Sequence, residues 1–302
     1  MTLPPPTPWA YRVIPRAPRG GRRGAGALAV ATLVAAIVSP SASRPALASL
    51  PGGLTASPVE LRSGPSTLRG ELVPGRRGAG AVLLLHGVGA SRHDMLARAR
   101  FLAGAGYSVL LIDFRGHGQS SAARSTWGAL ESHDVRAAVA FLRAAAPHER
   151  IGVIGISMGG AAALLGAAPL PVEALVLESV YPTVGDAVRG RLRAWLGPIG
   201  EALAPRVLRW LLPREGITAE DLRPIDRVHE QTAPVFVLAG TEDRYTTVRE
   251  SRELFARARE PKALWEVDGA GHVDLHAFSR AEYERRVGAF LARHLRGGDG
   301  GS

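Results

Sequence analysis

The sequence contains no cysteine, which excludes disulfide bonds, thiolate catalysis and lipid attachment to a leader cysteine. It also lacks internal repeats and a second series of strand and helix patterns, so its 302 residues predict one sizeable core rather than two. An apolar run from Ala25 to Val38 is present, but its 14 residues are too few for a comfortable membrane span, which takes about 20. We therefore expect most of the chain to form one soluble, folded domain.

Acidic residues are missing from the first 48 positions, which carry six arginines. Without those six, the 37 basic residues of the chain fall to 31, against 27 acidic ones, so the net charge of +10 falls to +4 over residues 49–302. This part of the chain has no basic run with interleaved aromatic residues, which a nucleic-acid groove would need. We predict no nucleic-acid partner.

Residues 1–48 have the layout of an export signal. Arginines up to Arg23 precede the apolar run, and Ala46 and Ala48 then offer an A-x-A cleavage site. We predict cleavage after Ala48 and an exported protein, periplasmic or extracellular. An uncleaved leader would instead anchor the chain to the membrane, and a leader that is not a signal would leave the protein in the cytoplasm.

Short apolar runs rich in branched residues recur along residues 49–302, after an alternating segment over 59–73 that predicts an antiparallel hairpin. The runs cover residues 81–87, 107–114, 150–157, 173–179, 234–240 and 262–267. Continuous apolar runs are typical of strands that are covered on both faces. Helical patterns fill the gaps, at 94–106, 132–146, 158–168, 247–260 and 279–295. This alternation predicts an α/β fold with a mostly parallel, doubly wound sheet and helices on both faces.

The interval of about 180–234 breaks this rhythm, because it is far longer than a crossover between two strands requires. Its apolar residues recur at nearly helical spacing, with arginines between them. We therefore predict that the interval is an insertion that forms a small helical cap on the domain of residues 49–302.

Ser157 stands within Gly-x-Ser-x-Gly, where the predicted strand 150–157 gives way to a helix. A serine hydroxyl is a poor nucleophile and needs a base that a carboxylate orients. Asp243 follows the predicted strand 234–240 and His272 follows 262–267, so both partners lie at later strand ends. The carboxyl ends of parallel strands share one edge of the sheet, and the pattern predicts that Ser157, Asp243 and His272 meet there.

Three further stretches carry a resemblance to a known family: "LLLHGVGAS" (83–91), "DFRGHGQS" (113–120) and "GISMGG" (155–160). With the order Ser, Asp, His, they make the chain similar to the α/β-hydrolase superfamily over roughly residues 59–296. The resemblance implies an esterase-like, lipase-like or serine aminopeptidase-like serine hydrolase. It implies Ser157 as nucleophile, His272 as base and Asp243 as the residue that orients it.

The resemblance also implies an oxyanion hole formed by two backbone N–H groups. One is that of Met158, directly after the nucleophile, and the other is that of Val88, with Gly89 as its competitor. His86 and Asp113 are expected to hold the backbone of the surrounding loops rather than to take part in catalysis.

Other residues compete for the catalytic roles. His276 lies four residues after His272, Glu242 precedes Asp243, and Glu178 ends an earlier predicted strand where some lipases keep their acid. The pattern contains no His-Glu-x-x-His metal motif and no Gly-x-Gly-x-x-Gly nucleotide fingerprint, so we predict neither a metal nor a cofactor.

The motifs specify the substrate less closely than they specify the catalytic residues. We expect a small acyl ester, with peptidase or thioesterase activity on the same triad, or a non-catalytic binding protein of this fold, as alternatives. Tyr181, Trp195 and Trp210 are candidates for an apolar acyl pocket, although the cap stripe would also serve simply to pack the cap on the core. Contact of the cap with anionic lipid is a third interpretation. The sequence leaves the oligomeric state open.

Overall fold

The computed structural model describes residues 55–121 and 125–296. The predicted leader, with its cleavage site after Ala48, lies outside the described residues.

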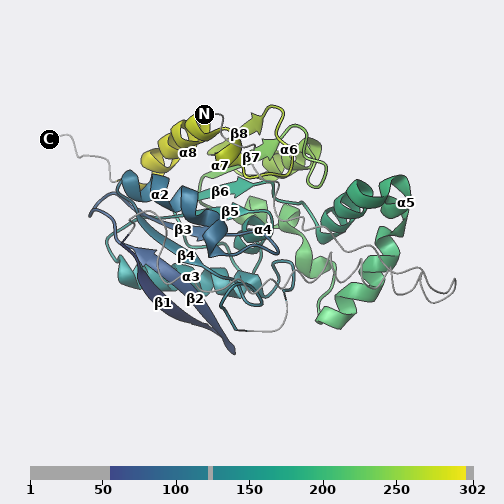
Figure 1. Cartoon of the computed structure of the whole chain (residues 1–302), viewed down its shortest axis with the longest axis horizontal. Coiled ribbons are helices and arrows are strands. Elements are labelled where there is room, and N and C mark those ends of the chain that lie inside the picture. The colour runs from purple at the N-terminus through teal and green to yellow at the C-terminus, as the bar shows by residue number, and fades with distance from the viewer. Residues whose placement is uncertain (1–54, 122–124, 297–302) are drawn as a thin grey trace, which may run out of the picture.

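A single mixed sheet of eight strands, in the order β1-β2-β4-β3-β5-β6-β7-β8, forms the centre of the molecule (Figure 1). The strands are β1 Ser57–Ser63, β2 Ser66–Val73, β3 Ala81–Leu85, β4 Ser108–Ile112, β5 Ile151–Ile156, β6 Ala174–Glu178, β7 Val235–Gly240 and β8 Lys262–Val267. β1 and β2 form the antiparallel hairpin, β2 pairs antiparallel with β4, and all remaining pairs are parallel. The six predicted apolar strands are confirmed, each within two residues of its expected limits.

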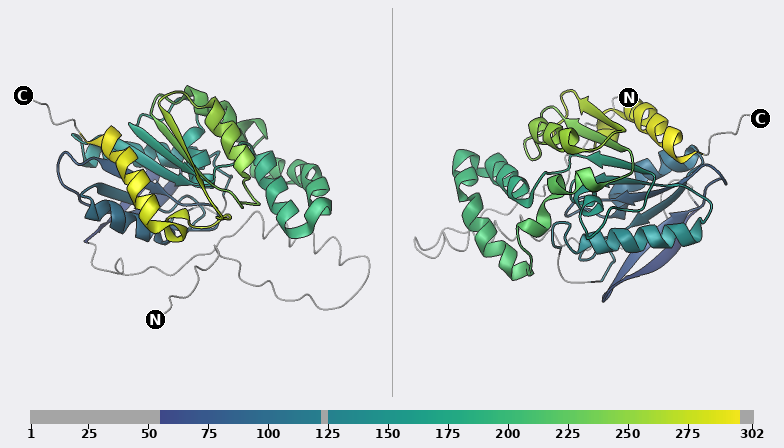
Figure 2. Two further views of the ribbon diagram at one scale, coloured as in Figure 1. Left: turned by 90° about the horizontal axis from the view of Figure 1, so that it is seen from above. Right: turned by 180° about the vertical axis from the view of Figure 1, so that it is seen from behind.

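Helices cover both faces of the sheet, which explains why the central strands are apolar throughout (Figures 1 and 2). One apolar core packs α3 (Glu131–Ala145), α4 (Met158–Leu164) and α6 (Val248–Arg257) against one face. A second core packs α2 (Leu96–Gly104) and α8 (Arg280–Leu295) against the other. The predicted doubly wound α/β architecture is therefore confirmed. Short turns complete it: η1 Arg92–Met95, η2 Glu220–Leu222, η3 Pro224–Asp226, η4 Val228–Glu230 and α7 Leu275–Phe278.

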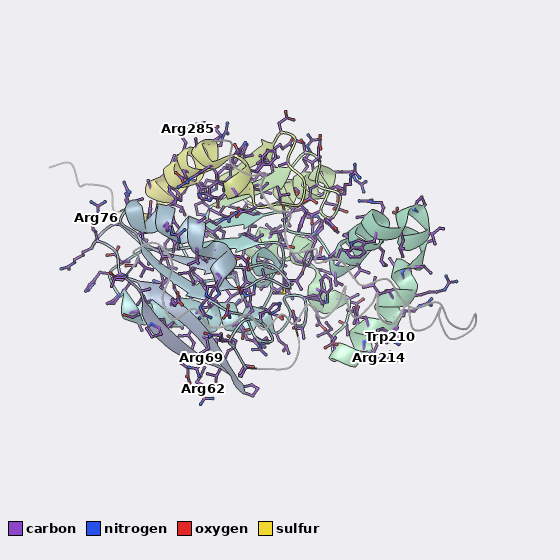
Figure 3. The ribbon with its side chains drawn as sticks, in the orientation of Figure 1. Arg62, Arg69, Arg76, Trp210, Arg214 and Arg285 are labelled. Atoms are coloured by element: carbon purple, nitrogen blue, oxygen red, sulfur yellow. The ribbon has the colours of Figure 1, made fainter. Side chains whose placement is uncertain are left out.

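The long interval between β6 and β7 holds α5 (Val184–Glu215), which bends sharply and stands out beyond the sheet (Figures 1 and 2). The bend is at Gly197, whose φ of 62° and ψ of −148° are not helical, and Pro198 follows it as the first residue of a new helical stretch. We call residues 184–196 the first arm and residues 198–215 the second arm. Trp210 and Arg214 lie together near the end of the second arm (Figure 3).

Strand register places the loops that follow β5, β6, β7 and β8 side by side. Ile156 of β5 pairs with Glu178 of β6, and Glu178 in turn pairs with Leu238 of β7. Gly240 at the end of β7 pairs with Val267 at the end of β8. The carboxyl ends of these four strands therefore form one edge, and the loops that leave it carry the predicted catalytic residues.

Candidate active site

Ser157 occupies the turn between β5 and α4, with a φ of 49° and a ψ of −114°. These angles are costly for a residue with a side chain, so the surrounding structure must hold them, and the N–H of Ser157 donates to the carbonyl of Glu178 at 2.8 Å. The flanking glycines are required by space. A Cβ on Gly155 would lie 2.6 Å from the Cα of Gly160, and one on Gly159 would lie 2.6 Å from the carbonyl oxygen of Leu85.

Asp243 and His272 are joined directly. Nδ1 of His272 lies 2.7 Å from Oδ2 of Asp243, whose side chain is buried. The other oxygen, Oδ1, accepts the backbone N–H groups of Tyr245 at 2.8 Å and Thr246 at 2.9 Å. Because an ionised carboxylate only accepts hydrogen bonds, Nδ1 carries the hydrogen and Nε2 is the basic nitrogen of the ring.

The Ser157 hydroxyl makes no hydrogen bond to any residue within the described ranges, so the structure links two of the three predicted catalytic residues directly. The third stands at the end of β5, on the same sheet edge. Hydrogen bonds between a nucleophile and its base are often long before substrate binds, so this arrangement is compatible with a resting triad.

The rivals of the predicted triad have other partners. His276 binds Glu284 through Nε2 at 3.0 Å, and its burial lowers the pKa of the imidazole. Glu178 accepts hydrogen bonds from Arg98 and from the hydroxyl of Tyr283. Glu242, the neighbour of Asp243, is exposed.

Glu178 belongs to a cluster that we call the Arg98 cluster: Arg98, Glu178 and Tyr283, which are buried, and Asp274, which is partly exposed. The guanidinium of Arg98 lies 2.7 Å from Glu178 and 2.8 Å from Asp274. Burial is the largest single influence and opposes the charge of Arg98, but the combined interactions with Glu178, Tyr283 and Asp274 outweigh it and raise the pKa of the guanidinium. Burial and the nearby Glu178 raise the pKa of Tyr283 as well.

Backbone contacts separate the two candidates for the second oxyanion donor. The N–H of Gly89 donates to Nε2 of His117 at 3.1 Å, whereas the N–H of Val88 makes no such bond within the described residues. Nδ1 of His117 contacts the carbonyl of Arg115 at 2.9 Å, which fixes the ring as the neutral tautomer that can accept from Gly89. The assignment of Val88 and Met158 as oxyanion donors stays a prediction. The N–H of Gly89, the competing donor, is already used in the hydrogen bond to His117.

His86 and Asp113 hold loops, as the sequence indicated. Nε2 of His86 accepts the N–H of Phe114 at 3.1 Å, and its Nδ1 lies 2.8 Å from the carbonyl of Gly87. Burial, with a smaller contribution from nearby His117, lowers the pKa of His86 to about 4, so the ring is neutral. Asp113 accepts the backbone N–H of Arg92 at 2.7 Å and also forms an ion pair with that arginine.

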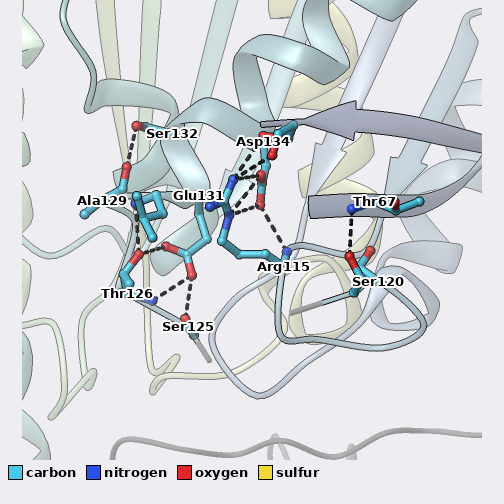
Figure 4. Close-up of polar contacts among 12 residues, drawn as sticks. Thr67, Arg115, Ser120, Ser125, Thr126, Ala129, Glu131, Ser132 and Asp134 are labelled. Atoms are coloured by element: carbon cyan, nitrogen blue, oxygen red, sulfur yellow. Dashed lines mark hydrogen bonds and ion pairs between the residues drawn. The ribbon is translucent and has the colours of Figure 1, made fainter. Parts of the chain in front are cut away.

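Two carboxylates at the start of α3 anchor the loop that follows β4 (Figure 4). Asp134 binds the side chain of Arg115 at 2.6 Å, and Glu131 accepts hydrogen bonds from Ser125, Thr126 and the N–H of Gly128. The roles of these residues and of His117 were not predicted from the sequence. Arg115 and His117 lie within the "DFRGHGQS" stretch, so their position in the motif was the available signal.

One further contact ties this loop to the candidate site. The hydroxyl of Ser125 lies 3.3 Å from Sδ of Met158, the residue directly after Ser157. The loop after β4 is therefore held both by α3 and by the start of α4.

The first arm of α5 touches the loop that carries Asp243. A Cβ on Gly190 would lie 2.1 Å from the carbonyl oxygen of Tyr245, so the arm approaches that backbone as only glycine allows. The guanidinium of Arg191 lies 4.8 Å from the ring centre of Trp127 and 6.0 Å from that of Tyr245. Tyr245 in turn packs edge-on against His272, with 5.3 Å between ring centres. The cap is thus in contact with the ring that flanks the predicted base.

The three predicted pocket residues differ in their surroundings. Tyr181 is buried, and its hydroxyl donates to the carbonyl of Trp127. Trp195 and Trp210 are 39% and 42% exposed. Side chains that line a ligand pocket are usually shielded from water, so this exposure gives the two tryptophans no support as pocket residues. Their role in an acyl pocket stays a prediction.

Among residues 55–121 and 125–296, no group of three or more His, Cys, Asp or Glu side chains could hold a metal ion. Over the same ranges, no helix is both long and apolar enough to cross a membrane.

Comparison with known proteins agrees with the observed fold. A family model described as alpha/beta hydrolase fold matches residues 80–197. The uncharacterized protein YqkD of Bacillus subtilis is 27% identical over 70% of each chain. The uncharacterized protein Rv2307c of Mycobacterium tuberculosis is 33% identical over 64% of this chain and 63% of its own length. The structure of the Pyrococcus furiosus esterase Pf2001 superposes with a TM-score of 0.67 at 28% identity, over 80% of this chain and 92% of that one.

Proposed function

The chain belongs to the α/β-hydrolase superfamily, and we propose that within it the protein is a serine hydrolase that cleaves a small acyl ester through a covalent acyl-enzyme. The observation that carries the proposal is the 2.7 Å contact between His272 and a buried Asp243, at the sheet edge where Ser157 stands in a strained turn. Nucleophilic acyl transfer requires a serine and an imidazole that a carboxylate orients, and these groups share one edge of the sheet here.

In the proposed reaction, Oγ of Ser157 attacks the carbonyl carbon of the ester while Nε2 of His272 takes the hydroxyl proton. The tetrahedral intermediate collapses, and the proton passes from His272 to the departing alcohol. Water, deprotonated by His272, then releases the acid from Ser157. Asp243 stabilises the imidazolium that forms at each step, and the two backbone N–H groups on Tyr245 and Thr246 keep its carboxylate in place.

Negative charge on the former carbonyl oxygen needs donors that are already in position. The proposed donors are the N–H groups of Met158, at the start of α4, and Val88. His117 supports this arrangement indirectly, because its bond to Gly89 holds the backbone of the loop that carries Val88. Removal of one such donor in other enzymes costs about 100- to 1,000-fold in rate.

The direct test is labelling with a fluorophosphonate probe, which reacts only with an activated serine. We expect one modified peptide, containing Ser157, and no labelling of Ser157→Ala. Folded protein that is not labelled would support the non-catalytic binding protein instead. A parallel panel of acyl esters, thioesters and peptides distinguishes the esterase from the thioesterase and peptidase alternatives, which would each be indicated by preferred turnover of the matching substrate.

Export of the protein is a separate proposal, which rests on the order of arginines, apolar run and A-x-A site in residues 1–48. Mass spectrometry of protein recovered outside the source cells is expected to find Ser49 at the amino terminus. An intact Met1 on cytosolic protein would overturn the signal peptide.

A further inference from the structure

The second arm of α5 presents an outer face that is both apolar and basic. This face is made of exposed residues at helical spacing: Ile199, Ala202, Arg206, Arg209, Trp210 and Arg214. Ile199 is 73% exposed, an unusual position for a large aliphatic side chain. The acidic residues of the arm, Glu201 and Glu215, lie off this face and are half-buried. The outer face therefore combines three positive charges with no negative one.

The opposite side of the same arm explains why the outer face points away from the protein. Ala204, Val207 and Leu211 are buried in the core that also contains the first arm. The helix is thus fixed by one side, which leaves the arginine-bearing side toward solvent. Arg214 lies over the ring of Trp210, with 4.1 Å to the ring centre, and donates to the Trp210 carbonyl at 2.7 Å. The aromatic ring and the cation are thereby presented together (Figure 3).

We propose that this outer face docks the protein on an anionic lipid surface. Helices that lie in a membrane interface have an apolar side with residues such as Trp and Leu, flanked by Arg or Lys that reach the lipid phosphates. Ile199 and Trp210 supply the apolar part, while Arg206, Arg209 and Arg214 supply the charge complementarity. Leu196, 41% exposed just before the bend at Gly197, extends the apolar part to the joint between the arms.

A second copy of the chain fits this face less well than lipid does. A symmetric dimer through the outer face would place the same three arginines against one another, and the face holds no acid to pair with them. A nucleic acid would complement the charge of the arginines. Its phosphate backbone, however, offers no apolar surface that would cover the exposed side chain of Ile199. The proposal goes beyond the proposed function and does not depend on it.

The absence of cysteine from the chain allows a test that reports on this face alone. Ala202→Cys in the full-length protein, labelled with a polarity-sensitive fluorophore, places the probe on the outer face. Ala140→Cys places the same probe on an exposed position of α3 as a control. Each labelled protein is mixed with two kinds of vesicle: neutral vesicles of phosphatidylcholine alone, and anionic vesicles of phosphatidylcholine with phosphatidylglycerol.

We expect a blue shift of the label at position 202 with the anionic vesicles, reversed by added salt, and none at position 140. Arg206→Gln, Arg209→Gln and Arg214→Gln together are expected to weaken vesicle binding on the order of 100-fold, since each arginine near an anionic surface contributes about 1 kcal/mol. The charge-matched control changes three exposed arginines elsewhere, Arg62, Arg249 and Arg293, to Gln and is expected to leave binding unchanged.

Several outcomes would overturn the proposal. Binding through residues 1–54 alone would leave both labels in water, even with the protein attached to vesicles. A blue shift at position 202 that grows with protein concentration without vesicles would identify a second copy as the occupant. A shift produced by an oligonucleotide but not by anionic vesicles would identify nucleic acid. A urea denaturation curve of the triple variant that matches wild type serves as the check that it is folded.

Discussion

Two polar clusters lie at neighbouring strand ends, and each is built on a carboxylate with a different kind of partner. At the end of β7, Asp243 binds His272, whose side chain is 19% exposed. At the end of β6, Glu178 binds Arg98 and Tyr283, and every one of these side chains is buried. The loop after β8 contributes to both clusters, with His272 in the first and Asp274 in the second.

The difference shows that the role of a carboxylate at a strand end depends on the side chain that it binds. Asp243 binds the imidazole of His272, the proposed base, whereas Glu178 is neutralised by a guanidinium that does not lose its proton. One cluster can therefore take part in chemistry while the other serves to hold the loop after β8 against α2 and α8. Substitutions at Asp243 or His272 should therefore mainly reduce activity, whereas substitutions in the Arg98 cluster should mainly reduce the free energy of unfolding.

The largest effect on activity is expected for the three proposed catalytic residues. Ser157→Ala, His272→Ala and the double variant should each lose at least about 10⁴-fold in kcat/KM and reach a similar residual rate, because residues that act as a unit are not additive. The measurement is ester hydrolysis by the three variants and the wild type. His276→Ala is the matched control and should keep most of its activity. If His276→Ala were the inactive variant, the base would have been assigned to the wrong histidine.

The next largest effect is expected on stability, in the Arg98 cluster. Arg98→Met leaves Glu178 as an uncompensated buried charge, which typically costs about 3–5 kcal/mol of unfolding free energy. Urea denaturation measures the loss, and Glu178→Leu in the same chain should recover much of it by removing that charge. Asp243→Asn should reduce activity while changing stability much less. Equal destabilisation by Arg98→Met and Asp243→Asn would remove the distinction between the clusters.

A smaller effect is expected on stability at acidic pH, through His86. The pKa of His86 is lowered from 6.5 to about 4 by burial, so the unfolded chain binds a proton at a pH where the folded chain does not. Stability is therefore complete above about pH 6.5 and declines as the pH falls toward 4, by roughly 3 kcal/mol for this group. Buried His276 acts in the same direction. Urea denaturation at several pH values should show a shallower decline for His86→Asn than for wild type, and an equal decline would show that His86 is not the group responsible.

The smallest effect is expected at the exposed tryptophans of the cap. If Trp195 or Trp210 lined an acyl pocket, its change to Ala would penalise long acyl chains, since each buried CH₂ contributes up to about 0.8 kcal/mol. Their exposure leads us to expect that kcat/KM falls little and that chain-length preference is unchanged. The measurement is kcat/KM over a series of esters of increasing acyl length. A selective loss on long esters would restore the pocket role predicted from the sequence.

Much of the fold and the candidate nucleophile could be predicted because their signals are local. Apolar runs mark strands that are covered on both faces, and the six strands of that kind were found close to their predicted limits. Gly155 and Gly159 mark Ser157 because a tight strand-to-helix turn leaves no room for a Cβ at either position. These requirements act within a few residues of chain, so the sequence states them directly.

The partners of the polar residues were decided by the tertiary structure. His272 and His276 follow the same strand, four residues apart. Their position alone does not separate them, although the resemblance favoured His272 as the partner of Asp243, and the contact between the two confirms it. The structure decides it with groups from distant parts of the chain: Glu284 of α8 binds His276, and Arg98 of α2 engages Glu178, 80 residues later. Likewise, the stripe of α5 predicted a helical cap, but the bend at Gly197 determines which residues of the second arm face solvent. A periodic pattern records that a side chain is apolar or charged, whereas its role depends on what the packed fold places against it.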